Sequence, residues 1–374
     1  MIELIYADNA ATTQLSQDAL EAMLPFFKAE YGNASEPYSF ARSAKKALLS
    51  ARKMIAHCIN ALPEEIYFTS GGTESDNWAL KGTMFVYGDN RELITSQIEH
   101  HAVLNSAATI EKMGYPVVYL PVDAEGVVQS DTLERYITDR TKLVSVMLSN
   151  NEIGTIQPIK ELAEIAHNYG ALFHTDAVQA VGHIRIDVKE LGVDMLSASA
   201  HKFNGPKGIG FLYIKKGTEI APYSDGGAQE SGKRAGTENI ALIVGMATAL
   251  HENNLTIKDN EVHLLEMEQN LLRHLDDAGI DYIRNGSKNR ILGTLSLSFR
   301  GFEGEMLLHR LDLKGICVST GSACDSKNTQ ISHVLQAIGL EEEYAVGTIR
   351  ISLGRLNTTA EVTAIADAII SIIK

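Results

Sequence analysis

The sequence has no uninterrupted apolar run that approaches the ~18 residues needed to cross a bilayer, so no membrane span is expected. Residues 1–5 carry no basic charge, so no signal peptide is expected either. There are only three cysteines in 374 residues, which is too few for a disulfide framework, and the odd number leaves at least one thiol free. The expected compartment is therefore the reducing cytoplasm.

Positive charge is also scarce. Lys and Arg number 33 against 47 Asp and Glu, which gives a net charge of −14. An acidic surface argues against nucleic acid as a direct partner, because phosphate backbones bind basic surfaces. The 374 residues exceed the usual size of a single core, so one large and one smaller domain are expected.

Strand-like and helix-like segments alternate through most of the chain. Apolar, β-rich runs at residues 65–69, 143–148 and 171–175 are each followed by a helical pattern. This alternation predicts an α/β fold with a mostly parallel sheet that helices cover on both faces. In such sheets ligands bind at the carboxyl ends of the strands, so polar residues directly after strands are the candidates for a site.

The pattern changes near residue 255. An amphipathic helix is predicted at 260–275, and shorter elements follow it: strands near 282, 295–297, 316–318 and 348–351, and helices at 304–313 and 359–373. We therefore predict a large cofactor-binding domain at 16–255 and a smaller C-terminal α/β domain at 256–374. The N-terminal arm, residues 1–15, is expected to pack on the smaller domain.

A glycine-containing segment, SGGTESDN at residues 70–77, follows the predicted strand at 65–69. Glycine permits close backbone approach, and the positive end of a helix beginning here would attract an anion. Thr73 and Asp76 also fit a capping box. By itself the segment is equally consistent with a helix start that binds nothing.

Two further polar positions end predicted strands. Asp176 needs a cationic partner if it is buried, and a protonated pyridine nitrogen would serve, although helix capping is the commoner role of such a residue. Lys202 at a buried strand end can form a Schiff base, with Lys207 in the following turn as the competing candidate. A chance occurrence of all three features at strand ends, an anion site, a carboxylate and a lysine, is much less expected than a chance occurrence of any one of them.

Several segments jointly resemble the class V aminotransferase superfamily of fold-type I pyridoxal-phosphate enzymes: DNAATT at 8–13, SGGTESDN at 70–77, NNEIG at 150–154 and HK at 201–202. Two later segments, GSAC at 321–324 and IRISLGR at 349–355, resemble the cysteine desulfurases of the NifS/IscS type. The resemblance extends from Tyr6 to about Arg355.

This resemblance implies a homodimeric, pyridoxal 5′-phosphate-dependent enzyme. It implies that Lys202 holds the cofactor as a Schiff base, that Asp176 keeps the ring nitrogen protonated, and that His100 stacks on the ring and moves protons, with His101 as the alternative. Further contacts to the cofactor are implied for Gln179 at the phenolate and for the phosphate-binding set Gly72, Thr73, Ser199 and His201.

The resemblance also implies residues for the partner subunit and the substrate. Thr237 would reach the phosphate bound to the partner subunit, while Asn151 and Arg350 would bind the substrate carboxylate, with Asn33 assisting. The chain departs from the family at residues 34–38, at Ala200 where glycine is frequent, and at Asn204 where an aromatic residue often lies. These departures concern the entrance and walls of the site.

The three cysteines have different surroundings in the sequence. Cys58 shares a predicted helical face with Leu48 and Ile55, and Cys317 lies in an apolar run, so both are expected to pack. Cys324 is followed by a polar stretch without periodicity, which is typical of an exposed segment. We therefore predict Cys324 as the sulfur-carrying thiol.

The resulting hypothesis is a cysteine desulfurase, a sulfurtransferase. It would convert L-cysteine to L-alanine and carry the sulfur as a persulfide on Cys324. The acceptor would be an iron–sulfur cluster scaffold or an enzyme of tRNA or cofactor thiolation. The alternatives are a selenocysteine lyase, another enzyme of the superfamily, and a scaffold of the sulfur system that has lost catalysis. No metal site is expected.

Overall fold

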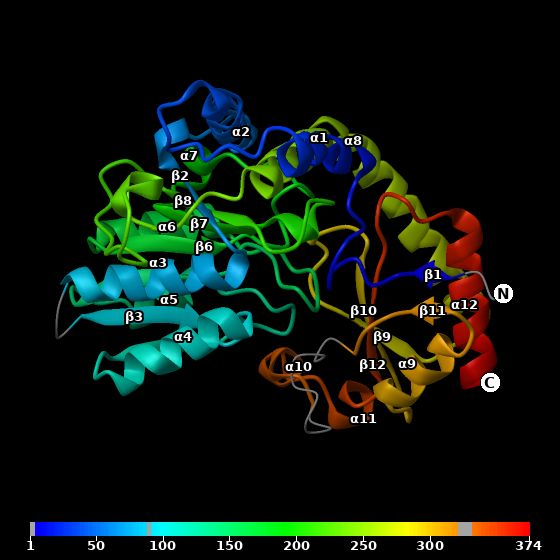
Figure 1. Cartoon of the computed structure of the whole chain (residues 1–374). Coiled ribbons are helices and arrows are strands. Elements are labelled where there is room, and N and C mark those ends of the chain that lie inside the picture. Colours follow the sequence, from blue (N-terminus) through cyan, green and yellow to red (C-terminus); the bar gives the residue numbers. More distant parts are fainter. Residues whose placement is uncertain (1–3, 88–90, 321–330) are drawn as a thin grey trace.

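A computed structural model describes residues 4–87, 91–320 and 331–374. Within these residues a seven-stranded sheet has the order β2-β8-β7-β6-β5-β3-β4 (Figure 1). Its members are β2 (Ile66–Thr69), β3 (Glu92–Ser96), β4 (Val117–Leu120), β5 (Thr141–Ser145), β6 (Leu172–Asp176), β7 (Met195–Ser199) and β8 (Gly210–Ile214). Strands β3 to β7 pair in parallel and β8 pairs antiparallel with both neighbours, so the predicted α/β fold with a mostly parallel sheet is confirmed.

Helices cover both faces of this sheet. Leu143 packs into a cluster with Trp78 and Met84 of α3, whereas its neighbour Val144 packs with Leu162 of α6 on the other face. This alternation explains the continuously apolar strands, because both faces are buried. The helices that precede and surround the sheet are α1 (Gln17–Lys28), α2 (Arg42–Cys58), α3 (Gly72–Tyr87), α4 (His101–Lys112), α5 (Ser130–Tyr136), α6 (Ile159–Asn168) and α7 (Val188–Leu191).

A second, smaller sheet lies beside the first (Figure 1). Strands β9 (Tyr282–Asn285), β10 (Thr294–Phe299) and β12 (Thr348–Ser352) are antiparallel in the order β12-β10-β9. The N-terminal β1 (Ile5–Tyr6) pairs in parallel with β11 (Ile316–Cys317). The accompanying helices are α9 (Gly304–Asp312), α10 (His333–Ala337), α11 (Glu342–Ala345) and α12 (Thr359–Ile373).

One long helix, α8 (Ile240–Asp277), connects the two sheets. Its first half contributes residues up to Leu250 to the core around the large sheet, and its second half contributes residues from Leu264 to the core of the small sheet. The predicted boundary at 255 lies inside this helix, between the two sets. The division into domains 16–255 and 256–374 stays a prediction.

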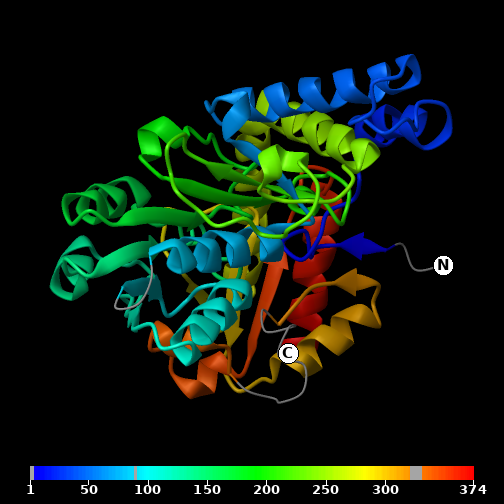
Figure 2. The same cartoon turned by 60° about the vertical axis from the view of Figure 1, so that its left-hand side comes forward.

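Four short 3₁₀ segments complete the described elements: η1 (Ser39–Ala41), η2 (Pro63–Glu65), η3 (Ala200–Lys202) and η4 (Gln229–Gly232). Helices α1 and α2 lie at the periphery, as Figure 2 shows in blue. In the described part of the chain, no helix combines the length and the apolar character that a membrane crossing requires.

Candidate active site

A cavity of about 210 Å³ opens where strands β6 and β7 end. Nine predicted site residues line it: Gly72, Thr73, His100, Asn151, Asp176, Gln179, Ser199, His201 and Lys202. They come from five separate segments of the chain, and the parallel sheet brings these segments to one edge. The structure therefore assembles most of the predicted site, while the roles of these residues stay predictions.

Helix α3 begins at Gly72 and directs its N-terminus at the cavity. A Cβ atom at Gly72 would lie 2.6 Å from Cγ2 of Val178, so only glycine allows the helix to approach this closely. The capping box predicted for Thr73 and Asp76 is wrong, because both residues lie inside the helix. Glu74 instead accepts a hydrogen bond from the backbone N–H of Ser70 at 3.0 Å. The first N–H groups of α3 and its dipole make this end of the cavity suitable for a phosphate.

Asp176 is a buried acidic residue that lines the cavity. Its side chain is buried, and Oδ1 accepts a hydrogen bond from the N–H of Val178 at 2.9 Å. Burial raises the pKa of Asp176 to about 6, and the Val178 N–H and Lys202 counteract part of this effect. A carboxyl group in such surroundings is stabilised as an anion by a cation placed in the cavity.

Lys202 lies at the end of η3, beside the N-terminal arm. Its Nζ donates to the carbonyl oxygens of Ala10 at 2.5 Å and Ala11 at 2.9 Å. The arm is attached to η3 by Thr13, whose N–H and hydroxyl both donate to the His201 carbonyl at 2.9 Å. Lys207, the competing candidate, is exposed and is not among the residues that line the cavity.

His100 is the N-cap of α4, and its Nδ1 accepts from the N–H of Ala102 at 3.1 Å. Burial, followed by the positive charge of Lys202, lowers the pKa of His100 to about 4, so its imidazole is neutral at pH 7. His101 instead packs against His333, with 5.0 Å between the ring centroids, and does not line the cavity. The geometry therefore favours His100 over the alternative His101.

Arg350 on β12 lies next to the cavity without lining it. Its Nη1 donates to the carbonyl of Asn151 at 2.9 Å, and its Nη2 donates to Oδ1 of Asp8 at 2.8 Å. The guanidinium is almost fully buried, and within residues 4–87, 91–320 and 331–374 its Nε has no hydrogen-bond partner. An orphaned, buried donor of this kind is suited to a carboxylate ligand.

The remaining predicted residues lie elsewhere. Asn33 and Thr237 line a different cavity of about 350 Å³, beside α1. Cys324 lies outside the described residues. A larger hollow of about 590 Å³ between the two cores contains none of the predicted residues.

The other two cysteines are only partly as predicted. Cys58 ends α2 and is buried in the core with Leu48 and Ile55, as expected. Burial raises the pKa of the Cys58 thiol to about 11. Cys317 is only partly buried, because the side chains of its neighbours Ile316 and Val318 enter the core in its place. Its pKa is also raised, chiefly by burial.

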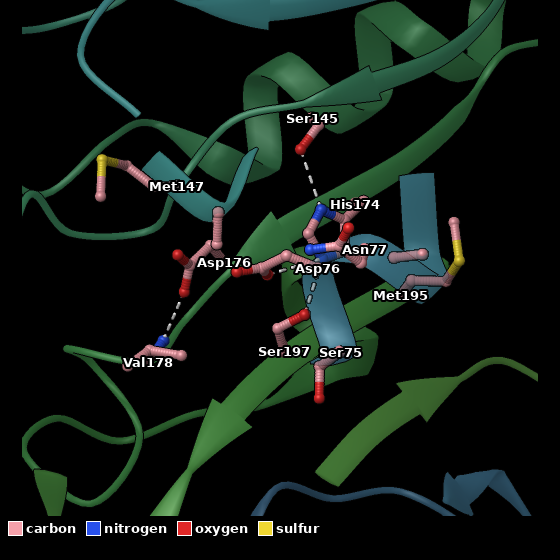
Figure 3. A network of polar contacts seen from close by, with 12 residues as sticks. Ser75, Asp76, Asn77, Ser145, Met147, His174, Asp176, Val178, Met195 and Ser197 are labelled. Carbon is pink, nitrogen blue, oxygen red and sulfur yellow. Dashed lines mark hydrogen bonds and ion pairs between the residues drawn. The ribbon is translucent and has the colours of Figure 1, made fainter. Parts of the chain in front are cut away.

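Three residues that sequence reasoning missed also line the cavity: Asp76, Met147 and Val178. Asp76 reaches it from the buried face of α3 and lies close to Asp176 (Figure 3). The departure at Asn204 also has a structural explanation. Its φ is +60°, a conformation that asparagine tolerates, and its side-chain amide donates to the carbonyl of Gln14 at 2.9 Å. Asn204 thus helps to hold the N-terminal arm.

Comparison with known proteins agrees with this geometry. Residues 5–365 match the model of the aminotransferase class-V family, and the chain belongs to that family, whose enzymes depend on pyridoxal phosphate. More particularly, the chain is 47% identical over 371 residues to the cysteine desulfurase IscS of Methanosarcina thermophila, and the match covers 99% of this chain and 92% of the relative.

Comparison with solved structures also finds similar proteins that align with nearly the whole chain. A NifS-like protein superposes with a TM-score of 0.94 at 38% identity, over 99% of both chains. A structure described as SspA in complex with cysteine superposes with a TM-score of 0.85 at 35% identity, over 95% of this chain and 100% of the other. The resemblance inferred from the motifs is confirmed.

The residues present fit pyridoxal phosphate. The α3 N-terminus, Thr73, Ser199 and His201 are suited to hold a phosphate. The buried carboxyl of Asp176 is suited to a protonated ring nitrogen, and the Lys202 amine lines the same cavity. Bound there, the cofactor would supply an electron sink for bonds to the substrate Cα.

Proposed function

We propose that the chain is a pyridoxal-phosphate-dependent cysteine desulfurase that converts L-cysteine to L-alanine and takes the sulfur as a persulfide on Cys324. The observation that carries the proposal is the single cavity in which a lysine, a buried aspartate and a helix N-terminus meet beside Arg350. The full-length likeness to proteins named cysteine desulfurase supports it.

Substrate binding is assigned to Arg350 and Asn151. The Asp8 carboxylate and the Asn151 carbonyl hold two nitrogens of the guanidinium, and the buried Nε remains for the substrate carboxylate. The Asn151 side chain lines the cavity and adds a hydrogen bond. Asn33 lies in a different cavity of the same chain, so any contribution from it would come from a partner subunit.

Proton transfer is assigned to Lys202. Its amine lines the cavity beside the N-terminal arm and would take up and return the proton of the substrate Cα. With pyridoxal phosphate bound, the Asp176 carboxylate would keep a proton on the ring nitrogen. His100 is neutral at pH 7, so it can accept and donate a proton next to the ring.

Sulfur transfer is assigned to Cys324. Its thiolate attacks the sulfur of the substrate, an S–S bond forms, and the Cβ–S bond breaks. The electron pair remains on the substrate carbon, which takes up a proton and leaves as alanine. The reaction is redox-balanced without an external oxidant. The raised thiol pKa values of Cys58 and Cys317 make those two residues poor nucleophiles, which supports the choice of Cys324.

We also propose a homodimer with both active sites at its interface. The cavity that contains Thr237 and Asn33 is bordered by the aromatic residues Phe27 and Tyr31, whose side chains are 57% and 70% exposed. Exposed aromatic clusters of this kind are typical of interfaces. Residue Thr237 would then complete the phosphate site of the partner subunit.

The dimer is tested by mixing two inactive variants. A hybrid of Lys202→Ala and Thr237→Ala subunits has one intact site if Thr237 acts across the interface, and none if it acts within its own chain. Recovery of one bound cofactor per hybrid dimer supports the shared site. No recovery contradicts it.

The sulfur acceptor is proposed to be an iron–sulfur cluster scaffold or a thiolation enzyme, because a persulfide must be delivered to another protein. A reducing cytoplasm is the proposed location. It would keep Cys58 and Cys317 as free thiols, which is their state in the structure.

The test of the activity is product stoichiometry with L-cysteine. We expect one alanine for each sulfur released by a thiol reductant. A keto acid product, with amination of the cofactor, would indicate an aminotransferase instead. Selenocysteine turnover without cysteine turnover would indicate a lyase.

A further inference from the structure

A row of buried polar side chains lies behind Asp176, on the face of the large sheet that α3 covers (Figure 3). It consists of Ser145 on β5, His174 on β6, Ser197 on β7 and Asp76 on α3, and all four are at most 1% exposed. The two ring nitrogens of His174 lie 2.9 Å from the Ser145 hydroxyl and 3.0 Å from the Ser197 hydroxyl. The proposed reaction assigns no step to these residues.

Asp76 is the unusual member of this row. Its Oδ1 has no hydrogen-bond partner among the residues that the structure describes, and the His174 Nε2 atom is 3.7 Å away. The same His174 nitrogen lies 3.0 Å from the Ser197 hydroxyl (Figure 3). The other titratable groups that act on Asp76 are the carboxyls of Asp176 and Glu99, so its surroundings contain more acidic groups than basic ones.

His174 does not supply a positive charge to this cluster. Complete burial lowers the pKa of His174 to about 3, so its imidazole is neutral at pH 7. Glu99 is also uncharged there, because burial raises its pKa to about 8. Asp76 is 1% exposed, and burial followed by the proximity of Asp176 raises its pKa well above the ordinary value.

Two neighbouring carboxyl groups in such a region do not both ionise. Asp176 is next to the cavity and has a cationic partner when the ring nitrogen of the cofactor is protonated. Oδ1 of Asp176 also accepts the N–H of Val178, whereas Asp76 is 1% exposed and its Oδ1 accepts no hydrogen bond from the described residues. The proton of the pair therefore belongs on Asp76.

We propose that Asp76 is a positioning residue held as a neutral carboxylic acid. With His174 and Ser197 it forms an uncharged layer that leaves Asp176 as the single negative charge next to the cofactor ring nitrogen. The proposal rests on the proposed role of Asp176 and is independent of which amino acid is the substrate.

The test uses the cofactor-loaded protein and two spectroscopic readouts. Enzyme containing pyridoxal phosphate labelled with ¹⁵N in the ring reports whether the ring nitrogen is protonated. We expect Asp76→Asn to keep the protonated ¹⁵N shift and the parent visible spectrum, because the substitution replaces one neutral group with another. The matched variant Asp176→Asn is expected to move the shift to its unprotonated value. If Asp76→Asn moves the ¹⁵N shift of the ring nitrogen to the same value as Asp176→Asn does, Asp76 is ionised and the proposal is wrong.

A second measurement needs no variant. A neutral carboxylic acid has an infrared carbonyl band that a carboxylate lacks, and ¹³C labelling of aspartate shifts that band but leaves a band from Glu99 in place. We expect a label-sensitive band at pH 7 in the loaded wild-type protein, and its loss in Asp76→Asn. Absence of the band in the wild type overturns the proposal. Neither readout requires turnover, so failure of the desulfurase assignment alone would leave both results unchanged.

Discussion

Replacing Arg350 with alanine tests the proposed carboxylate site. The guanidinium is 6% exposed, is held by Asp8 and Asn151, and has one buried donor without a partner. Hydrogen bonds to charged groups contribute about 1.5–3 kcal/mol each. Loss of this charged contact should therefore cost about 1.5–3 kcal/mol, which corresponds to a roughly 13- to 160-fold decrease in kcat/KM.

The assay is steady-state formation of alanine from cysteine, with the visible spectrum as a check that the cofactor remains bound. The loss in kcat/KM should appear mainly as a raised KM, because the carboxylate contact is made in the bound substrate as well as in the transition state. Arg355→Ala is the matched control, since Arg355 is also largely buried and pairs with Glu252 at 2.8 Å. An unchanged KM in Arg350→Ala, or an equal increase in Arg355→Ala, would refute the reasoning.

Three further outcomes follow from the structure. Lys202→Ala should lose the visible absorbance of the lysine-bound cofactor, whereas Lys207→Ala should keep it; the reverse pattern would move the attachment to the turn. Asp176→Asn should raise the melting temperature of the cofactor-free protein at pH 7. Burial raises the folded-state pKa of Asp176 from 3.8 to about 6, so ionisation of Asp176 progressively destabilises the folded protein as the pH rises from about 4 to 6. The increase in melting temperature caused by Asp176→Asn should therefore vanish near pH 4. A lower melting temperature of Asp176→Asn at pH 7 would contradict this. Cys58→Ser should retain turnover but lose about 1–3 kcal/mol in urea unfolding, because a hydroxyl replaces a buried thiol, while Cys317→Ser should lose less; equal losses would contradict the difference in burial.

Much of the site was predictable because a parallel sheet brings the carboxyl ends of its strands to one edge. Asp176 and Lys202 are polar residues at or just after the ends of apolar strands, and the glycine at the start of α3 indicates a close backbone approach. A pattern along one chain therefore predicted which residues meet. Arg350 was found only through family resemblance, since no local pattern distinguishes it from other strand arginines.

The unpredicted features depend on tertiary contacts. Asp76 fits a capping position in the sequence, but the helix begins at Gly72 and turns Asp76 towards the sheet. The Asp8–Arg350 pair joins residues 342 positions apart. Lys202 is held by backbone carbonyls of the N-terminal arm, which have no sequence signature.

The central claim is that sulfur from cysteine is carried by Cys324, and peptide mass spectrometry tests it most directly. The protein is incubated with L-cysteine, alkylated without reductant and digested. The account predicts one additional sulfur atom on the peptide that contains Cys324, removable by a thiol reductant and absent in Lys202→Ala. Alanine release with the added sulfur on Cys58 or Cys317, or on no cysteine, would contradict it.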